Sequence, residues 1–179
     1  MNEINIEENQ VCPNCDKETL TTTETKREIP YFGEASLYSL RCHNEYCDFF
    51  QADVEALSDK GPLTVTYTIT KEDDVNTRVV KSSDATVHIG NIGSIEPGSS
   101  SAGYITTVEG VLNRMLSQIQ YQEKTSDSQE DIDLARRYID ELEAVLQGEK
   151  ELTLEIDDPK GNSMIISEDA DVSELKQRE

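Results

Sequence analysis

The sequence predicts a mainly β protein in two parts, a small cysteine-containing N-terminal unit and a β domain with an inserted antiparallel helical hairpin. Three observations predict it. All four cysteines fall within residues 10–56. Segments typical of strands follow from residue 62, and two apolar stripes of helical period lie between those strands. The turn-forming stretch at 58–62 separates the domains, predicted at 10–56 and 62–167, and the polar, acidic residues 168–179 predict a mobile tail.

The cysteines form two close pairs, Cys12 with Cys15 and Cys42 with Cys47, separated by 26 residues. Pairs spaced in this way can place four thiolates around one tetrahedral Zn²⁺, and residues 19–26 and 35–41 would then pair as strands of a zinc ribbon. Four protein ligands leave no position for water, so the predicted zinc is structural. The second pair has four intervening residues in place of the usual two, and His43 is an alternative to Cys42 as ligand.

Two other interpretations of the cysteines are less favoured. A disulfide pair needs an oxidising compartment, and the acidic first eight residues do not resemble a signal peptide, so we expect a cytoplasmic protein. A redox Cys-Pro-Asn-Cys motif needs βαβ surroundings, which the flanking residues do not show.

The net charge argues against polyanionic partners. Asp and Glu number 37 against 16 Lys and Arg, which gives a net charge of -21. Nucleic acids and anionic membranes are polyanions, so we expect no direct binding to either. No apolar run approaches the roughly 18 residues that a membrane span needs.

The β domain opens with its clearest strand pattern, residues 63–70, where apolar residues alternate with threonine. Shorter strands are predicted at 79–80, 86–89, 152–156 and 164–166, and residues 90–103 predict a loop. The hairpin is predicted over about 106–147. Thr106 and Glu109 would form a capping box at its start, and its second helix would end at Gly148.

Nothing in the sequence predicts an enzyme. There are only two histidines, and no nucleophile triad, phosphate-binding glycine loop or His-x-x-x-His helix is present. His88 falls on the polar face of its predicted strand, opposite Val87 and Ile89, where a histidine needs no functional explanation.

Five short strings together resemble one family. They are Ile-Pro-Tyr-Phe-Gly-Glu at 29–34, Arg-Val-Val-Lys-Ser at 78–82, Ile-Glu-Pro-Gly at 95–98, Gly-Tyr-Ile-Thr-Thr-Val-Glu-Gly at 103–110 and Asp-Asp-Pro-Lys-Gly-Asn-Ser at 157–163. With the cysteine pairs, their order resembles the Zpr family of zinc-finger proteins in its single-module, archaeal form. The resemblance implies a zinc ribbon followed by a double-stranded β-helix (jelly-roll-like) domain with a helical hairpin. It also implies binding to translation elongation factor 1-alpha and, in eukaryotes, assistance with that factor's folding. We expect a monomer.

The family strings and nearby charges supply candidate partner-binding residues: Arg78, Lys81, Gly98, Thr107, Glu109, Gly110, Asp158, Gly161 and Asn162. Each also has a structural interpretation. Residues 157–163 have the composition of a tight turn, Gly110 in a helix indicates a close approach of backbone, and the two cations can pair within the chain. Residues 120–179 hold 18 acidic and 7 basic residues, so this C-terminal part is the predicted electrostatic face toward the tRNA-phosphate surface of the factor, with adaptation to a salty cytoplasm as the alternative.

Two other functions stay open on the sequence alone. One is a zinc-ribbon accessory factor in transcription or nucleic-acid metabolism, against which the net charge of -21 argues. The other is a ligand-binding jelly-roll domain, because such domains often hold ligands in their interior.

Overall fold

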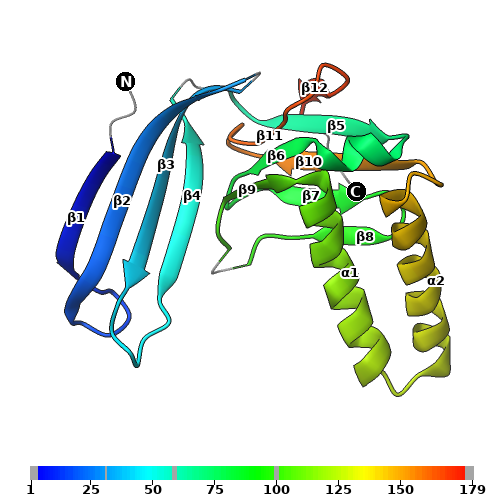
Figure 1. The fold of residues 1–179 in the computed structure, drawn as a ribbon, viewed down its shortest axis with the longest axis horizontal. Coiled ribbons are helices and arrows are strands. Elements are labelled where there is room, and N and C mark those ends of the chain that lie inside the picture. The colour runs from blue at the N-terminus through cyan, green and yellow to red at the C-terminus, as the bar shows by residue number, and fades with distance from the viewer. Residues whose placement is uncertain (1–3, 31, 58–59, 99–100, 176–179) are drawn as a thin grey trace.

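The protein consists of a four-stranded sheet beside a two-sheet β domain from which a helical hairpin projects (Figure 1). A computed structural model describes residues 4–30, 32–57, 60–98 and 101–175. Tyr31 of the first family string, residues 58–59 of the predicted boundary and residues 176–179 of the predicted tail lie outside the described residues. The mainly β fold with a helical hairpin, predicted from the sequence, is confirmed.

The N-terminal sheet, here called the ribbon, contains β1 (Ile4–Val11), β2 (Glu18–Ile29), β3 (Gly33–Cys42) and β4 (Phe50–Ala56), antiparallel and in chain order. The strands β2 and β3 cover the segments predicted at 19–26 and 35–41. The ribbon also includes β1 and β4, so it begins at Ile4 and not at residue 10. The residues of β1 are exposed throughout, and a bulge with Asn9 at φ 59° interrupts its pairing with β2. Its sequence therefore lacks the unbroken alternation of apolar and polar residues that would predict a strand.

The β domain has two antiparallel sheets. One has the order β12-β5-β10-β7-β8 and the other β11-β6-β9. Their bounds are β5 (Leu63–Ile69), β6 (Arg78–Lys81), β7 (Thr86–Ile89), β8 (Gly93–Ile95), β9 (Tyr104–Thr107), β10 (Leu152–Asp158), β11 (Met164–Ile165) and β12 (Asp171–Glu174), with a short 3-10 helix η1 (Glu72–Asn76) after β5.

The hairpin consists of α1 (Val108–Thr125) and α2 (Gln129–Leu146). The apolar stripe of α1 packs with β-domain residues in one core, which includes Val111, Leu112, Leu154 and Ile156, all fully buried. Gly148, at φ 72°, ends α2, where Gly148 N–H donates to Val145 and Glu149 N–H to Ala144 in a Schellman motif. Neither helix has an apolar stretch that could cross a membrane.

Three boundaries differ from the sequence-based expectations. Thr106 belongs to β9, and the N-cap of α1 is Thr107, whose hydroxyl accepts from Gly110 N–H at 3.1 Å, so the predicted capping box with Glu109 is wrong. The expected loop at 90–103 contains β8, which pairs with β7.

The third difference is at the C-terminus. The residues expected to form a mobile tail include β12, which pairs with β5. Pairing with an existing strand supplies backbone hydrogen bonds that do not depend on an apolar pattern, and all four β12 residues are exposed.

Candidate functional site

The four cysteines converge at one end of the ribbon. Their Sγ atoms all lie within 4.8 Å of one another, and the Cys12–Cys47 and Cys15–Cys42 separations are both 3.8 Å. Zinc–sulfur bonds of about 2.3 Å in a tetrahedron place the sulfurs about 3.8 Å apart. The four cysteines therefore form a zinc-binding site, as their spacing predicted, and the longer gap in the second pair does not displace Cys42 or Cys47.

Short turns of the ribbon hold the ligands in place. In the first turn Cys12 N–H donates to Lys17 and Asp16 N–H to Cys12, and in the second Cys47 N–H donates to Asn44. Asn14 Nδ2 donates to Cys47 Sγ at 3.4 Å, and Thr19 Oγ1 lies 3.2 Å from Cys42 Sγ. His43, the alternative ligand, is exposed and lies outside the ligand group.

The thiols lie in different electrostatic surroundings. Burial raises the pKa of Cys12 to about 11, while the backbone hydrogen bond from Lys17 lowers the pKa of Cys15 to about 6. The Thr19 hydroxyl lowers the pKa of Cys42. Zn²⁺ binds thiolates and holds a coordinating thiol deprotonated, so the metal would make the four groups equivalent in charge. With four protein ligands, the chemistry that zinc supplies here is structural.

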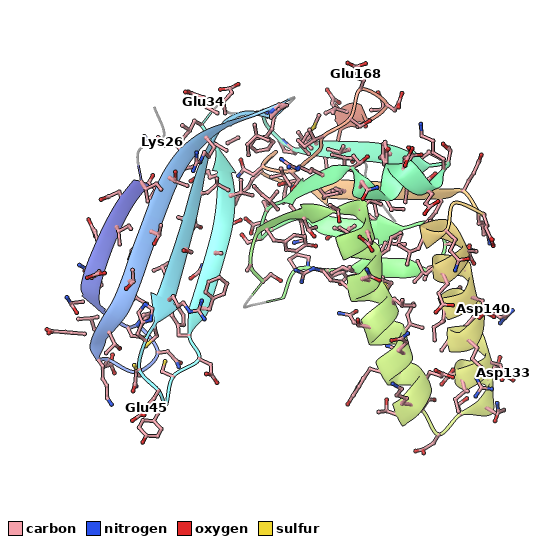
Figure 2. The ribbon with its side chains drawn as sticks, in the orientation of Figure 1. Lys26, Glu34, Glu45, Asp133, Asp140 and Glu168 are labelled. Carbon is pink, nitrogen blue, oxygen red and sulfur yellow. The ribbon has the colours of Figure 1, made fainter. Side chains whose placement is uncertain are left out.

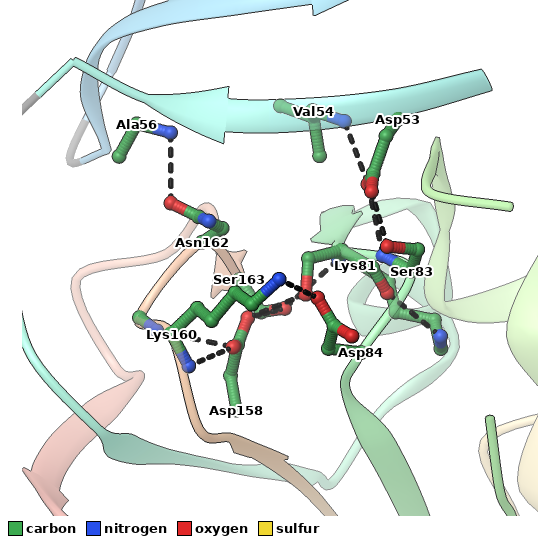
Figure 3. A network of polar contacts seen from close by, with 12 residues as sticks. Asp53, Val54, Ala56, Lys81, Ser83, Asp84, Asp158, Lys160, Asn162 and Ser163 are labelled. Atoms are coloured by element: carbon green, nitrogen blue, oxygen red, sulfur yellow. Dashed lines mark hydrogen bonds and ion pairs between the residues drawn. The ribbon is translucent and has the colours of Figure 1, made fainter.

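A second polar site joins the ribbon to the β domain along the outer edge of β4 (Figure 3). Gly103 N–H donates to Ala52 O at 2.8 Å, and Ala56 N–H donates to Asn162 Oδ1 at 2.8 Å. Between them, Val54 N–H donates to Asp53 Oδ1 at 2.8 Å. An unpaired strand edge offers hydrogen-bonding groups to other chains, and here the β domain covers that edge.

Asp158 organises the β-domain side of this junction. It is fully buried, and its Oδ1 accepts from the backbone of Lys160 at 2.8 Å and of Gly161 at 3.0 Å. Its Oδ2 accepts from Ser82 Oγ at 2.8 Å and from Ser163 Oγ. Four donors satisfy a buried carboxylate without a metal or a partner.

Three further contacts complete the junction. Asp53 accepts from both the backbone and the hydroxyl of Ser83, so the ribbon carboxylate reaches into the β domain. Lys160 forms an ion pair with Asp84 at 2.8 Å. The buried ammonium of Lys81 donates to Ser82 O at 2.8 Å, and burial lowers its pKa although Asp53, Asp158 and Asp84 act in the opposite direction.

The structure separates the candidate partner-binding residues into three groups. Lys81, Asp158 and Gly161 are buried, and half-buried Asn162 is bound to Ala56. Thr107 caps α1, and a Cβ at Gly110 would contact Thr106 Oγ1, which explains that helical glycine. The exposed members are Arg78, Gly98 and Glu109.

Sequence reasoning missed several members of the junction, among them Asp53 and Gly103. A Cβ at Gly103 would contact the Asp53 carboxylate and lie 2.9 Å from Asp53 Cα, so the two backbones approach too closely for a side chain. The burial of Asp158, by contrast, could have been predicted from the sequence. Asp158 continues the parity of Leu152, Leu154 and Ile156, which places it on the buried face of β10.

Known proteins similar to this chain match it along nearly its whole length. A family model described as the ZPR1 jelly-roll domain matches residues 73–179. A ZPR1-like protein of Methanocaldococcus jannaschii is 34% identical over 170 residues, which cover 94% of this chain and 85% of that one. A ZPR1-like protein of Pyrococcus horikoshii is also 34% identical, over 94% of this chain and 77% of its own.

Eukaryotic relatives match over a part of their length. The zinc finger chaperone zpr1 of Schizosaccharomyces pombe is 32% identical over 160 residues, which cover 87% of this chain and 34% of that protein. The zinc finger protein ZPR1 of Mus musculus is 31% identical with the same coverage. Together with the cysteine site, these matches show that the chain belongs to the ZPR1 family of zinc-finger proteins.

Proposed function

We propose that this chain binds translation elongation factor 1-alpha and assists its folding. The observation that carries the proposal is membership of the ZPR1 family over both the ribbon and the β domain. Binding to the elongation factor is the activity that the family resemblance implies, and one relative at 32% identity is named a zinc finger chaperone.

The shape of the molecule fits a protein-binding role. The ribbon and the helical hairpin extend from the β domain in the same direction, and Glu45 marks the cysteine end of the ribbon (Figures 1 and 2). In the ribbon, Ile4, Ile6 and Phe50 are each more than half exposed. Strand pairing places them on the face that also carries Leu37 and Val54. Exposed apolar residues that share one face are typical of protein contact surfaces.

The acidic residues supply the second part of the proposal. Asp133 and Asp140 are exposed on α2 (Figure 2), within residues 120–179, whose net charge is -11. A surface of the factor that receives tRNA phosphates is basic by necessity, so an acidic binder complements it. The complex should then weaken as salt rises.

Isothermal titration of the zinc-loaded protein with elongation factor 1-alpha from the same source tests this proposal. The factor would be used in GDP-bound, GTP-bound and nucleotide-free forms, each at low and high salt. We expect one-to-one binding whose affinity falls with salt. Asp133→Asn with Asp140→Asn should reduce the salt dependence, and Gln129→Glu, which adds an acid on the same helix, should not reduce it.

A refolding experiment separates chaperoning from binding. Denatured elongation factor would be diluted with and without this protein, and the recovery of nucleotide binding would be measured. A higher yield with the protein supports assistance with folding. No binding to any form of the factor, together with an unchanged refolding yield, would contradict the proposal.

A further inference from the structure

A cleft of about 750 Å³ lies between β4 and α1, next to the junction of the two domains. Phe50 and Ala52 of the ribbon form one wall, Arg114 and Ser117 of α1 form another, and Tyr104 of β9 lies between them. Because Lys81 and Tyr104 are directly paired across β6 and β9, their side chains share one face of that sheet.

The cleft contains hydrogen-bond donors without acceptors. The Tyr104 hydroxyl is buried and has no hydrogen-bond partner among the described residues. The Arg114 guanidinium lies 4.4 Å from the centre of the Tyr104 ring, and within the described ranges it forms no hydrogen bond or ion pair. Buried polar groups in native proteins are almost always paired, so the unpaired Tyr104 hydroxyl requires an explanation, and the exposed Arg114 guanidinium beside it is free to donate to a ligand.

The nearby carboxylates do not supply that pairing. Asp53 and Asp158 accept hydrogen bonds from serines of the junction, and Asp84 pairs with Lys160. Glu96, the one acidic residue among the described residues that line the cleft, accepts from Ser94 at 3.4 Å. The described lining of the cleft thus carries two cations, Lys81 and Arg114, against one carboxylate, in a chain whose net charge is -21.

From this geometry we propose that the cleft binds a carboxylate side chain of a protein partner. Arg114 presents a planar fork of donors that matches a carboxylate, and the Tyr104 hydroxyl adds a further donor. Phe50, which is 56% exposed, and Ile95 give the cleft apolar walls. A ligand that carries apolar atoms beside its carboxylate fits these walls better than a free inorganic anion does. The proposal does not depend on which protein the chain binds.

Nuclear magnetic resonance titration of the ¹⁵N-labelled, zinc-loaded full chain tests it with three probes: acetyl-Phe-Glu-amide, acetyl-Phe-Gln-amide and inorganic phosphate. We expect the glutamate dipeptide to shift the backbone amides of Gly103, Tyr104 and Arg114. The glutamine dipeptide has no carboxylate charge and cannot form the charge-assisted hydrogen bond. It should therefore bind about 10-fold or more weakly than the glutamate dipeptide.

Three variants locate the interaction. Arg114→Gln should weaken binding of the glutamate dipeptide by about 10-fold. Tyr104→Phe, which keeps the ring and removes the hydroxyl, should weaken it by about three-fold. Arg137→Gln, at an exposed arginine of α2, is the matched control and should leave binding unchanged.

Equal affinity for the two dipeptides, or binding that Arg114→Gln does not change, would overturn the proposal. Phosphate that binds as tightly as the glutamate dipeptide would also overturn it, because the cleft would then be a site for free oxyanions. An Arg114→Gln variant that loses the dipeptide and still binds the elongation factor would support the cleft and leave the proposed function intact.

Discussion

Asn162 and Ala56 lie 106 positions apart in the chain, and their hydrogen bond fastens the β domain to the ribbon. The Ala56 N–H of the edge strand β4 donates to Asn162 Oδ1 at 2.8 Å. Asn162 sits in the turn that Asp158 holds in place, so the family string at 157–163 acts as a joint between the two domains (Figure 3).

Replacing Asn162 should loosen this joint. Asn162→Ala leaves the Ala56 N–H without its acceptor, and we expect a loss of about 1–2 kcal/mol in the free energy of unfolding. Urea unfolding measures the loss, and hydrogen exchange at Ala56 should become faster. Asn162→Asp retains the acceptor oxygen and is the matched control. Unchanged exchange at Ala56 in Asn162→Ala would show that the hydrogen bond does not hold the edge.

The buried carboxylate should be more costly to lose. Asp158→Ala removes the acceptor of four hydrogen bonds in a fully buried position, so we expect a loss of about 3–5 kcal/mol. Asp140→Ala, on the exposed face of α2, should change stability by no more than about 0.5 kcal/mol. Chemical denaturation of both variants gives the comparison, and equal losses would contradict the structural role of Asp158.

A methyl group at Gly103 should separate the domains. Its Cβ would meet the Asp53 carboxylate and lie 2.9 Å from Asp53 Cα, so β4 and β9 must move apart, at a cost of about 1–3 kcal/mol. At Gly98 the nearest atom to an added Cβ is Ser101 Oγ at 3.9 Å, so Gly98→Ala is the control and should change stability little. Thermal unfolding of the two alanine variants tests the difference.

Removal of zinc should unfold the ribbon first. The metal-ligand bonds of a structural zinc site contribute roughly 10–16 kcal/mol of apparent binding energy, and the ribbon cluster around the ligands contains few other buried residues. We expect elemental analysis to give one zinc per chain for the wild type and none for Cys42→Ser or after chelation, and we expect amide protection in β2 and β3 to be lost with the metal. His43→Ala should keep the zinc. A zinc-free His43→Ala protein would show that His43 is a ligand after all.

The buried Lys81 should give stability a pH dependence in the alkaline range. Because burial lowers its pKa below 10.5, the unfolded chain holds this proton more tightly than the folded chain does. The free energy of unfolding contributed by Lys81 should therefore rise with pH between the lowered pKa and 10.5, and be constant below that window. Urea unfolding of the wild type and Lys81→Met over this range isolates the contribution. Lys124→Met, at an exposed site, is the control.

Patterns that depend on neighbouring residues were readable from the sequence. The two cysteine pairs specified the zinc site because tetrahedral thiolate coordination needs only close pairs brought together. The alternation at 63–70 specified β5, and the 3.6-residue apolar stripes specified α1 and α2, because burial of one face imposes each period.

Features that depend on what lies across the fold needed the tertiary structure. Thr106 and Thr107 are chemically alike, and only the pairing of β9 with β6 decides that the second one caps the helix. The residues of β12 are exposed and show no apolar period, so no local pattern predicts this strand. It forms because its backbone pairs with β5. The string at 157–163 has the composition of any tight turn. Its role as a joint arises because the far edge of β4 presents an N–H at Ala56 that Asn162 can reach, and no local pattern encodes a contact between residues 106 positions apart.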